Sequence, residues 1–206
     1  MNRQILKLAI PNVISNITIP FVGIIEIALM GRLGSSAYIG GVGFGAMLFT
    51  LIFTGLAFLR MGTTGMTAQA YGASNFKETS YVLSRSVILA IFLGFGLILL
   101  QMPIKFLFIS SLNGSEEALA VAAQYFYVRI WAAPATLSIF AFTGWFIGMQ
   151  NSKIPMIVTI IVSISNIILS SIFVFYLDMA VVGVALGTVI AQYIGLSVCV
   201  ISYQIR

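Results

Sequence analysis

The chain has 206 residues, of which 60% are hydrophobic and 7% charged, whereas about a quarter of the residues in soluble domains are charged. Apolar residues are spread along the whole chain and must face lipid, which excludes a water-soluble globular domain. The ten Lys and Arg residues, which give a formal net charge of +5, occur singly rather than in a patch. Nucleic acid is therefore not an expected partner.

An enzyme is also not expected. The chain has no His and one Cys, so it lacks the ligands for a zinc centre, the pairs for a disulfide framework and the residues for a Cys/His nucleophile. Five acidic residues are too few for a catalytic acid/base set at one membrane depth. No cofactor is predicted.

Charged residues divide the chain into six uncharged intervals of 18 to 27 residues, and a helix needs about 20 residues to cross hydrocarbon. Strands are not expected, because an open sheet edge leaves backbone groups unpaired in lipid. We predict an all-α integral membrane protein with one domain, 1–206, of six transmembrane helices. The predicted spans are 8–31, 38–70, 81–103, 118–149, 154–177 and 180–203.

The distribution of basic residues predicts the orientation of this bundle. Six crossings place both termini on one side of the membrane. The loops on that side hold six basic residues and the opposite loops hold two, Arg32 and Lys105. Because basic loops stay inside, both termini are predicted to be cytoplasmic, in a multi-pass protein of the plasma (cytoplasmic) membrane. The six are Arg3, Lys7, Lys77, Arg85, Lys153 and Arg206.

Three pairs of glycines have GxxxG spacing. Small residues at this spacing let neighbouring helices approach closely in a membrane, so each pair is expected at a helix–helix contact. The pairs are Gly41 and Gly45, Gly144 and Gly148, and Gly183 and Gly187.

The first span carries polar residues on one helix face. Separations of four, seven and three residues keep these positions on the same side of a helix, which should point into the bundle. A carboxylate withdrawn from water favours its protonated form, so Glu26 is predicted to bind a proton or a sodium ion and to release it when water enters. No other metal is expected. The positions are Asn12, Asn16, Gly23 and Glu26.

Two prolines, Pro11 and Pro20, precede Glu26 on the same span. Each removes one backbone hydrogen bond, and helices bend at such sites. We predict that this span bends at the prolines when the charge at Glu26 changes. The alternative is that Glu26 is locked in an ion pair with Arg60 or Arg129.

Arg60 and Arg129 fall inside the second and fourth predicted spans. A charged side chain at mid-bilayer costs about 2.5 to 3.5 kcal/mol on insertion scales, so each arginine should meet a partner or a cavity. Arg60 stands in a stretch rich in small and hydroxyl residues, 58–65, which favours a helix–helix contact with the guanidinium paired or extended toward the membrane surface. A place in a substrate cavity is the alternative for Arg60, and it is also considered for Arg129 and for Gln192 of the sixth span.

The fifth and sixth spans carry a second set of polar residues. At about 1.5 Å per residue, Glu26, Ser170 and Thr188 reach similar depth in the outer half of the membrane. Their oxygens are predicted to hold a proton or a sodium ion jointly. Interhelical hydrogen bonding without ion binding is the alternative. The polar residues are Thr159, Ser163, Asn166 and Ser170 on the fifth span and Thr188 and Gln192 on the sixth.

Five short stretches together resemble the multidrug and toxic compound extrusion (MATE) family. The stretch around Arg60 is most similar to the DNA-damage-inducible protein F branch of that family, and the resemblance covers essentially the whole chain. The stretches are 8–11 (LAIP), 30–34 (MGRLG), 60–65 (RMGTTG), 67–72 (TAQAYG) and 183–192 (GVALGTVIAQ).

The resemblance implies the N-terminal six-helix lobe of a twelve-helix transporter that exports small cationic or amphiphilic organic compounds by antiport with protons or sodium. It places the family's first-span acid on Glu26, its fifth-span Asn on Asn166 and its sixth-span Thr on Thr188. Members usually carry Asp where this chain has Glu26, and many carry a further Asp where it has Ser170.

A single lobe forms only one wall of the substrate cavity, so a second six-helix lobe is an expected partner, either a separate C-terminal half or a second copy. Two other functions remain open. One is a transporter of lipid-linked sugars, which a strongly basic cavity would favour. The other is a truncated membrane subunit with no transport activity of its own.

Overall fold

The computed structural model describes residues 2–205, except for the side chains of residues 2–9, 11–12, 14–16 and 19–20. Regular secondary structure within 2–205 is helical throughout. The helices are α1 (Asn2–Gly31), α2 (Ser36–Gly55), α3 (Phe58–Gly72), α4 (Phe76–Leu99), α5 (Gln101–Ser110), α6 (Glu116–Arg129), the short 3-10 helix η1 (Ile130–Ala132), α7 (Ala133–Gly148), α8 (Lys153–Phe175) and α9 (Ala180–Gln204).

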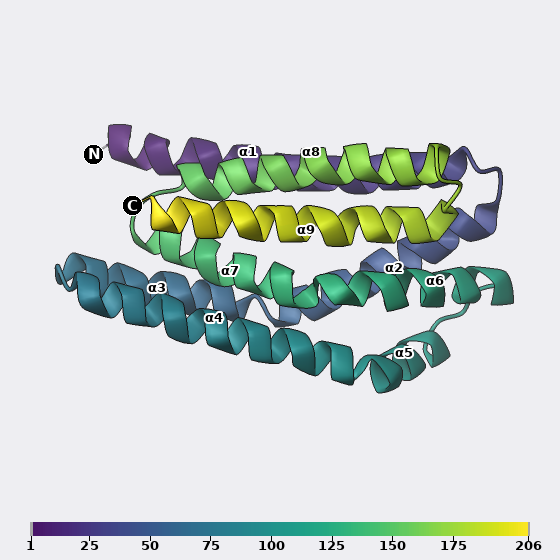
Figure 1. The fold of residues 1–206 in the computed structure, drawn as a ribbon, viewed down its shortest axis with the longest axis horizontal. Coiled ribbons are helices and arrows are strands. Elements are labelled where there is room, and N and C mark those ends of the chain that lie inside the picture. The colour runs from purple at the N-terminus through teal and green to yellow at the C-terminus, as the bar shows by residue number, and fades with distance from the viewer. Residues whose placement is uncertain (1, 206) are drawn as a thin grey trace.

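The helices form an elongated bundle in which α1 packs on α8, α8 on α9, α2 on α6, and both α3 and α4 on α7. The beginning of α1 and the end of α9 lie at the same end of the bundle, together with the α3–α4 and α7–α8 turns (Figure 1). This placement fits an even number of crossings.

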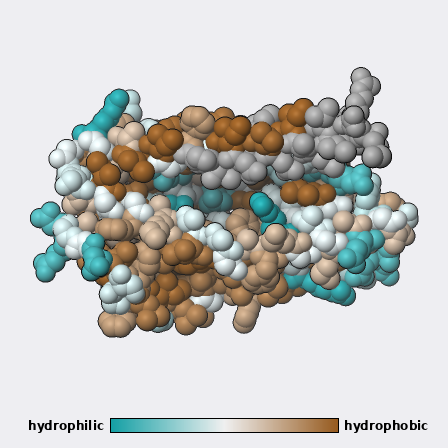
Figure 2. Space-filling model, turned by 180° about the vertical axis from the view of Figure 1, so that it is seen from behind, coloured by the Kyte–Doolittle hydropathy of each residue, from teal (hydrophilic) through white to brown (hydrophobic). Residues whose placement is uncertain are grey.

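Five helical segments among the described residues are long and apolar enough to cross a membrane. The 30-residue α1 is a further long helix, and its described apolar part is Phe21–Gly31. Figure 2 shows hydrophobic residues over much of the long sides of the molecule, hydrophilic residues at both ends, and further hydrophilic residues along a furrow. The protein is an all-α integral membrane protein, as predicted. The five segments are Ser36–Gly72, Phe76–Leu99, Glu116–Gly148, Lys153–Phe175 and Ala180–Gln204.

Two of the predicted spans are interrupted. Residues 38–70 form α2 and α3, with a turn directly after Gly55, a residue type that costs about 1 kcal/mol in a helix interior. Residues 118–149 form α6, η1 and α7. Pro134 has no N–H to bond the carbonyl of Ile130, and the chain is a 3-10 helix at this point.

The predicted span 81–103 also differs from the structure. The helix α4 begins earlier, at Phe76, and ends at Leu99, and a separate α5 follows. Pro103 cannot donate the backbone hydrogen bond that would continue α4, but it is tolerated in the first turn of a new helix. None of the residues of α5 is buried.

The glycine pairs lie at helix–helix contacts, as predicted. A Cβ atom added at Gly148 would lie 2.6 Å from Cβ of Thr67, and one added at Gly187 would lie 2.7 Å from the backbone nitrogen of Ser170. Real Cβ atoms do not approach other atoms so closely. The close contacts of α7 with α3 and of α9 with α8 therefore require glycine.

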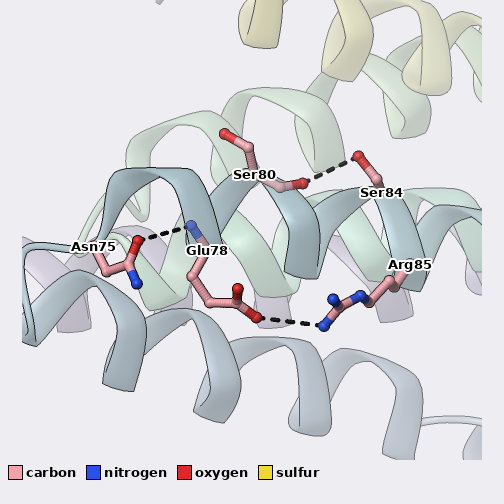
Figure 3. Close-up of polar contacts among 5 residues, drawn as sticks. All are labelled: Asn75, Glu78, Ser80, Ser84 and Arg85. Atoms are coloured by element: carbon pink, nitrogen blue, oxygen red, sulfur yellow. Dashed lines mark hydrogen bonds and ion pairs between the residues drawn. The ribbon is translucent and has the colours of Figure 1, made fainter.

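The aqueous end of α4 holds an exposed polar group (Figure 3). The Asn75 side chain accepts a hydrogen bond from the backbone N–H of Glu78 (3.1 Å) and caps the helix. The Glu78 carboxylate also pairs with Arg85 at 3.3 Å, and the two side chains are 40% and 67% exposed. This end of the bundle is the one at which α1 begins and α9 ends.

Candidate functional site

Three helices meet around a buried carboxylate. Glu26 of α1 is only 5% exposed, and Asn166 of α8 and Thr188 of α9 are 4% exposed each. The Asn166 amide and the Thr188 hydroxyl each donate to Oε1 of Glu26 at 3.1 Å. The Asn166 amide also donates to the Thr188 hydroxyl at 2.8 Å. We call these three residues the polar cluster.

One hydrogen-bond acceptor in the polar cluster has no donor. Both N–H groups of Asn166 have acceptors, but its carbonyl oxygen Oδ1 is buried and has no partner. The Thr188 hydroxyl has one hydrogen and two acceptors within reach, Glu26 Oε1 and the Val184 carbonyl at 3.0 Å. Buried acceptors are normally paired, so the unpaired Oδ1 of Asn166 is an exception within the polar cluster.

The packing around the polar cluster keeps water away from it. Met30, one turn after Glu26, and Val184, one turn before Thr188, are both 0% exposed and belong to one hydrophobic core cluster. Burying an ionised carboxylate in such surroundings is costly unless its charge is neutralised. The Glu26 carboxylate is thus enclosed by apolar side chains and by the two neutral donors of the polar cluster.

Neither Arg60 nor Arg129 forms an ion pair within 4 Å of Glu26. In the part of the chain that the structure describes, the one ion pair within 4 Å joins Arg85 and Glu78. Glu26 and Arg129 interact electrostatically, but the Arg129 guanidinium donates to the Tyr125 hydroxyl. The predicted alternative of a carboxylate locked to an arginine is thus not found.

Among the described residues, Ser170 and Gln192 have no hydrogen bond to the polar cluster, although the Ser170 and Thr188 hydroxyls are both within hydrogen-bond distance of the Val184 carbonyl. Ser170 is fully buried, and its hydroxyl donates to the Val184 carbonyl at 3.5 Å while its backbone packs on Gly187. Gln192 follows Thr188 by one turn of α9 and is half-buried. Their predicted role in cation binding or in the substrate cavity stays a prediction.

Pro11 and Pro20 both lie within α1, which is one continuous helix in the structure. Their side chains are outside the described residues. The bending that we predict at these positions remains a prediction.

Arg60 and Arg129, which lie 69 positions apart in the sequence, line one cleft of about 310 Å³. The Arg129 guanidinium carbon lies 5.1 Å from the centre of the Phe49 ring and 5.2 Å from that of Tyr125. The turn between α2 and α3 and the start of η1 are next to the cleft, since Ala57 and Arg129 belong to its wall. The lining residues are Phe49, Thr50, Phe53, Thr54, Ala57, Arg60, Arg129 and Phe140.

The aromatic part of this cleft is missing from the sequence-based candidates. A signal was present in the spacing, because Phe49 and Phe53, like Tyr125 and Arg129, are four residues apart and share a helix face. Only the packing of α2 on α6 shows that the two faces meet.

A metal centre built from side chains is absent from the described residues, which contain no group of three or more His, Cys, Asp or Glu residues. The polar cluster offers oxygen ligands, namely the carboxylate of Glu26, the unpaired carbonyl of Asn166 and the hydroxyl of Thr188. Oxygen atoms are the ligands that hard cations prefer.

Comparison with known proteins gives a consistent family assignment. The MatE family model matches residues 11–172. The chain is 40% identical over 192 residues to DNA damage-inducible protein F of Escherichia coli K12, and 28% identical over 200 residues to the probable multidrug resistance protein NorM of Thermotoga maritima. These alignments cover 93% and 95% of this chain but 42% and 43% of the relatives.

The fold is found in solved transporter structures. A MOP superfamily transporter from Pyrococcus furiosus superposes with a TM-score of 0.88 at 23% identity, and a MATE structure in the bent conformation with a TM-score of 0.85 at 25% identity. The superpositions cover 95% and 96% of this chain and 43% and 44% of those chains. The chain therefore has the fold of one lobe and spans less than half the length of its relatives.

Proposed function

Because the chain belongs to the MatE family, we propose that it forms the N-terminal lobe of a secondary transporter that exports a small organic compound by antiport with protons or sodium ions. Members of this family are transporters rather than enzymes. The relatives named above include a probable multidrug resistance protein, which supports a drug-like substrate for this chain.

The polar cluster is the observation that carries the proposal. Glu26 is buried and is held by neutral donors from two other helices, Asn166 and Thr188, instead of by an arginine. A carboxylate with neutral partners is free to exchange a proton or a cation, and the unpaired Oδ1 of Asn166 is available as a further acceptor.

Coupling follows from the change of charge at Glu26. The ionised carboxylate accepts the hydrogen bonds that join α1 to α8 and α9, and charge-assisted bonds are stronger than neutral ones. Binding of a proton or cation weakens them. We propose that α1 then moves relative to α8 and α9, with Pro11 and Pro20 as bending sites, and that this motion opens the substrate cavity to the other side of the membrane.

A second six-helix lobe is part of the proposal. The chain covers about 43% of the transporters it matches, and alternating access in transporters built from repeats needs one bundle to move against another. We propose that both termini are cytoplasmic in the plasma membrane, because basic residues gather at the end of the bundle where α1 begins.

Ion binding and export can be tested separately. The purified protein in neutral detergent is expected to bind radioactive sodium, or to take up protons, with a dependence on Glu26. Glu26→Gln is expected to abolish this binding and Glu26→Asp to retain it, while the matched surface variant Glu78→Gln leaves it unchanged. Unchanged ion binding in Glu26→Gln would falsify the proposed coupling site.

Export is then measured as the loss of an accumulated fluorescent dye from cells that produce the chain with its second lobe. Efflux should stop in Glu26→Gln and continue in Glu78→Gln. Glu26-dependent ion binding without efflux would instead support the alternative of a non-transporting subunit.

A further inference from the structure

The two arginines that fall inside the predicted spans lie together, away from the carboxylate of the first span. Arg60 and Arg129 line the same cleft, and Glu26 belongs to the polar cluster instead. Arg129 has the Tyr125 hydroxyl and two aromatic rings as partners. Among the described residues, the Arg60 guanidinium has no ion pair, hydrogen bond or ring contact, and Arg60 is exposed at the cleft.

The two arginines differ in how far the surrounding structure stabilises their positive charges. Arg129 lies in the last turn of α6, where the helix dipole stabilises a cation. Arg60 is the third residue of α3, and this first turn has neither an acidic residue nor a side-chain cap. The dipole disfavours a cation at this position. The structure therefore gives a stabilising partner to Arg129 but none to Arg60.

The wall beside the arginines is apolar and aromatic. The ring centres of Phe49 and Phe53 are 5.8 Å apart, and those of Phe53 and Phe140 are 6.2 Å apart. The exposed hydroxyl groups of Thr50 and Thr54 also border the cleft. A cleft with two guanidinium groups next to the partly exposed rings of Phe53 and Phe140 matches a ligand with an anionic group and an apolar ring or chain.

We infer that this cleft binds a negatively charged amphiphile, whose carboxylate or phosphate contacts Arg60 and Arg129 and whose apolar part packs on the half-buried rings of Phe53 and Phe140. The inference rests on the proposed transport function and specifies its substrate class. It departs from the cationic substrates that the family resemblance implies. Guanidinium groups bind such oxyanions through two parallel hydrogen bonds, and the ligand neutralises the charge of Arg60.

Two dyes with the same ring system and opposite charge provide the test. Fluorescein is anionic and rhodamine 123 is cationic, and both have a xanthene core. Fluorescence anisotropy with the purified protein in neutral detergent is expected to show tighter binding of fluorescein. Arg60→Gln should weaken fluorescein binding by roughly tenfold or more, whereas the surface variant Arg85→Gln should not change it. Tighter binding of rhodamine 123, or unchanged fluorescein binding in Arg60→Gln, would overturn the inference.

A second variant distinguishes loss of the ligand contact from loss of the fold. Arg60→Lys keeps the charge but loses the paired hydrogen bonds, so it should bind fluorescein with an affinity between those of wild type and Arg60→Gln. Equal binding by wild type, Arg60→Lys and Arg60→Gln would contradict a contact between the ligand and this side chain.

Competition identifies the source of the anionic group. Displacement of fluorescein by benzoate supports a soluble aromatic carboxylate, and displacement by farnesyl diphosphate supports a lipid-linked diphosphate. Displacement by either compound supports the anion site. If neither compound displaces fluorescein, the inference is overturned. This test of the cleft is independent of the test of antiport. If dye binding depends on Arg60 while ion binding does not depend on Glu26, the proposed antiport is rejected and the anion site in the cleft is retained.

Discussion

Glu26 and Glu78 are carboxylates of one chain in opposite surroundings. Glu26 is 5% exposed and accepts hydrogen bonds from Asn166 and Thr188, with no cation within 4 Å among the described side chains. Glu78 is exposed at the aqueous end of α4, where it pairs with Arg85 at 3.3 Å (Figure 3).

The two carboxylates therefore differ in how much their contacts should contribute to stability. Exposed pairs contribute about 0 to 1 kcal/mol, because water and salt screen them. A buried carboxylate with neutral donors has no such screening, so each of its hydrogen bonds has a larger effect on stability. Four substitutions test this comparison.

The largest loss of stability is expected for Asn166→Leu. This change removes both hydrogen bonds of the Asn166 amide within the polar cluster and leaves the Glu26 carboxylate with fewer donors. The expected cost is about 3 kcal/mol, because an unsatisfied buried charge is penalised more than a neutral group. The measurement is thermal unfolding of the purified protein in detergent. A loss no larger than that of Arg85→Gln would contradict the comparison.

A smaller loss, about 2 kcal/mol, is expected for Gly187→Ala, because the added methyl group meets the backbone of Ser170 and separates α8 from α9. The same separation would move Asn166 away from Thr188. Gly43→Ala is the matched control, since nothing lies within 4 Å of a Cβ atom at Gly43. Similar unfolding temperatures for the two alanine variants would show that this contact does not require glycine.

Thr188→Val should cost about 1 kcal/mol, the usual range for one interhelical hydrogen bond in a membrane protein. The substitution keeps the shape of the side chain and removes the donor to Glu26. Thr159→Val is the control, because the Thr159 hydroxyl donates to the Pro155 carbonyl of its own helix at 3.0 Å. The two variants are compared by thermal unfolding, and an equal cost would argue against a contribution from the bond to Glu26.

The smallest effect is expected for Arg85→Gln, at most about 1 kcal/mol. Because the pair with Glu78 is exposed, its contribution should shrink further as salt is raised, whereas the effect of Asn166→Leu should not. Unfolding in low and high salt measures both trends. A salt-dependent loss for Asn166→Leu would indicate that water reaches the polar cluster.

Much of the fold follows from the sequence, because apolar length alone decides which segments can cross a bilayer. The spans 154–177 and 180–203 are close to α8 (Lys153–Phe175) and α9 (Ala180–Gln204). The breaks near Gly55 and Pro134 are missing from the prediction, since hydropathy does not register them. Glycine and proline are frequent in membrane helices and often leave them unbroken.

The candidate site was predictable only in part. Helical spacing indicates which side chains of one helix share a face, and it places Asn166 and Ser170 on the same face of α8. It does not give the rotation of α8 against α1. The structure brings Asn166 to Glu26, whereas Ser170 packs on Gly187.

The sequence by itself determined that the chain is an all-α membrane protein, and it determined which few polar residues the membrane spans contain. Both properties depend on composition and local periodicity. Only the tertiary structure decided which of those residues meet. Glu26 lies with Asn166 and Thr188, and Arg60 lies with Arg129 beside phenylalanines, through contacts between helices far apart in the chain. Such contacts depend on the packing of whole helix surfaces, which no local pattern specifies.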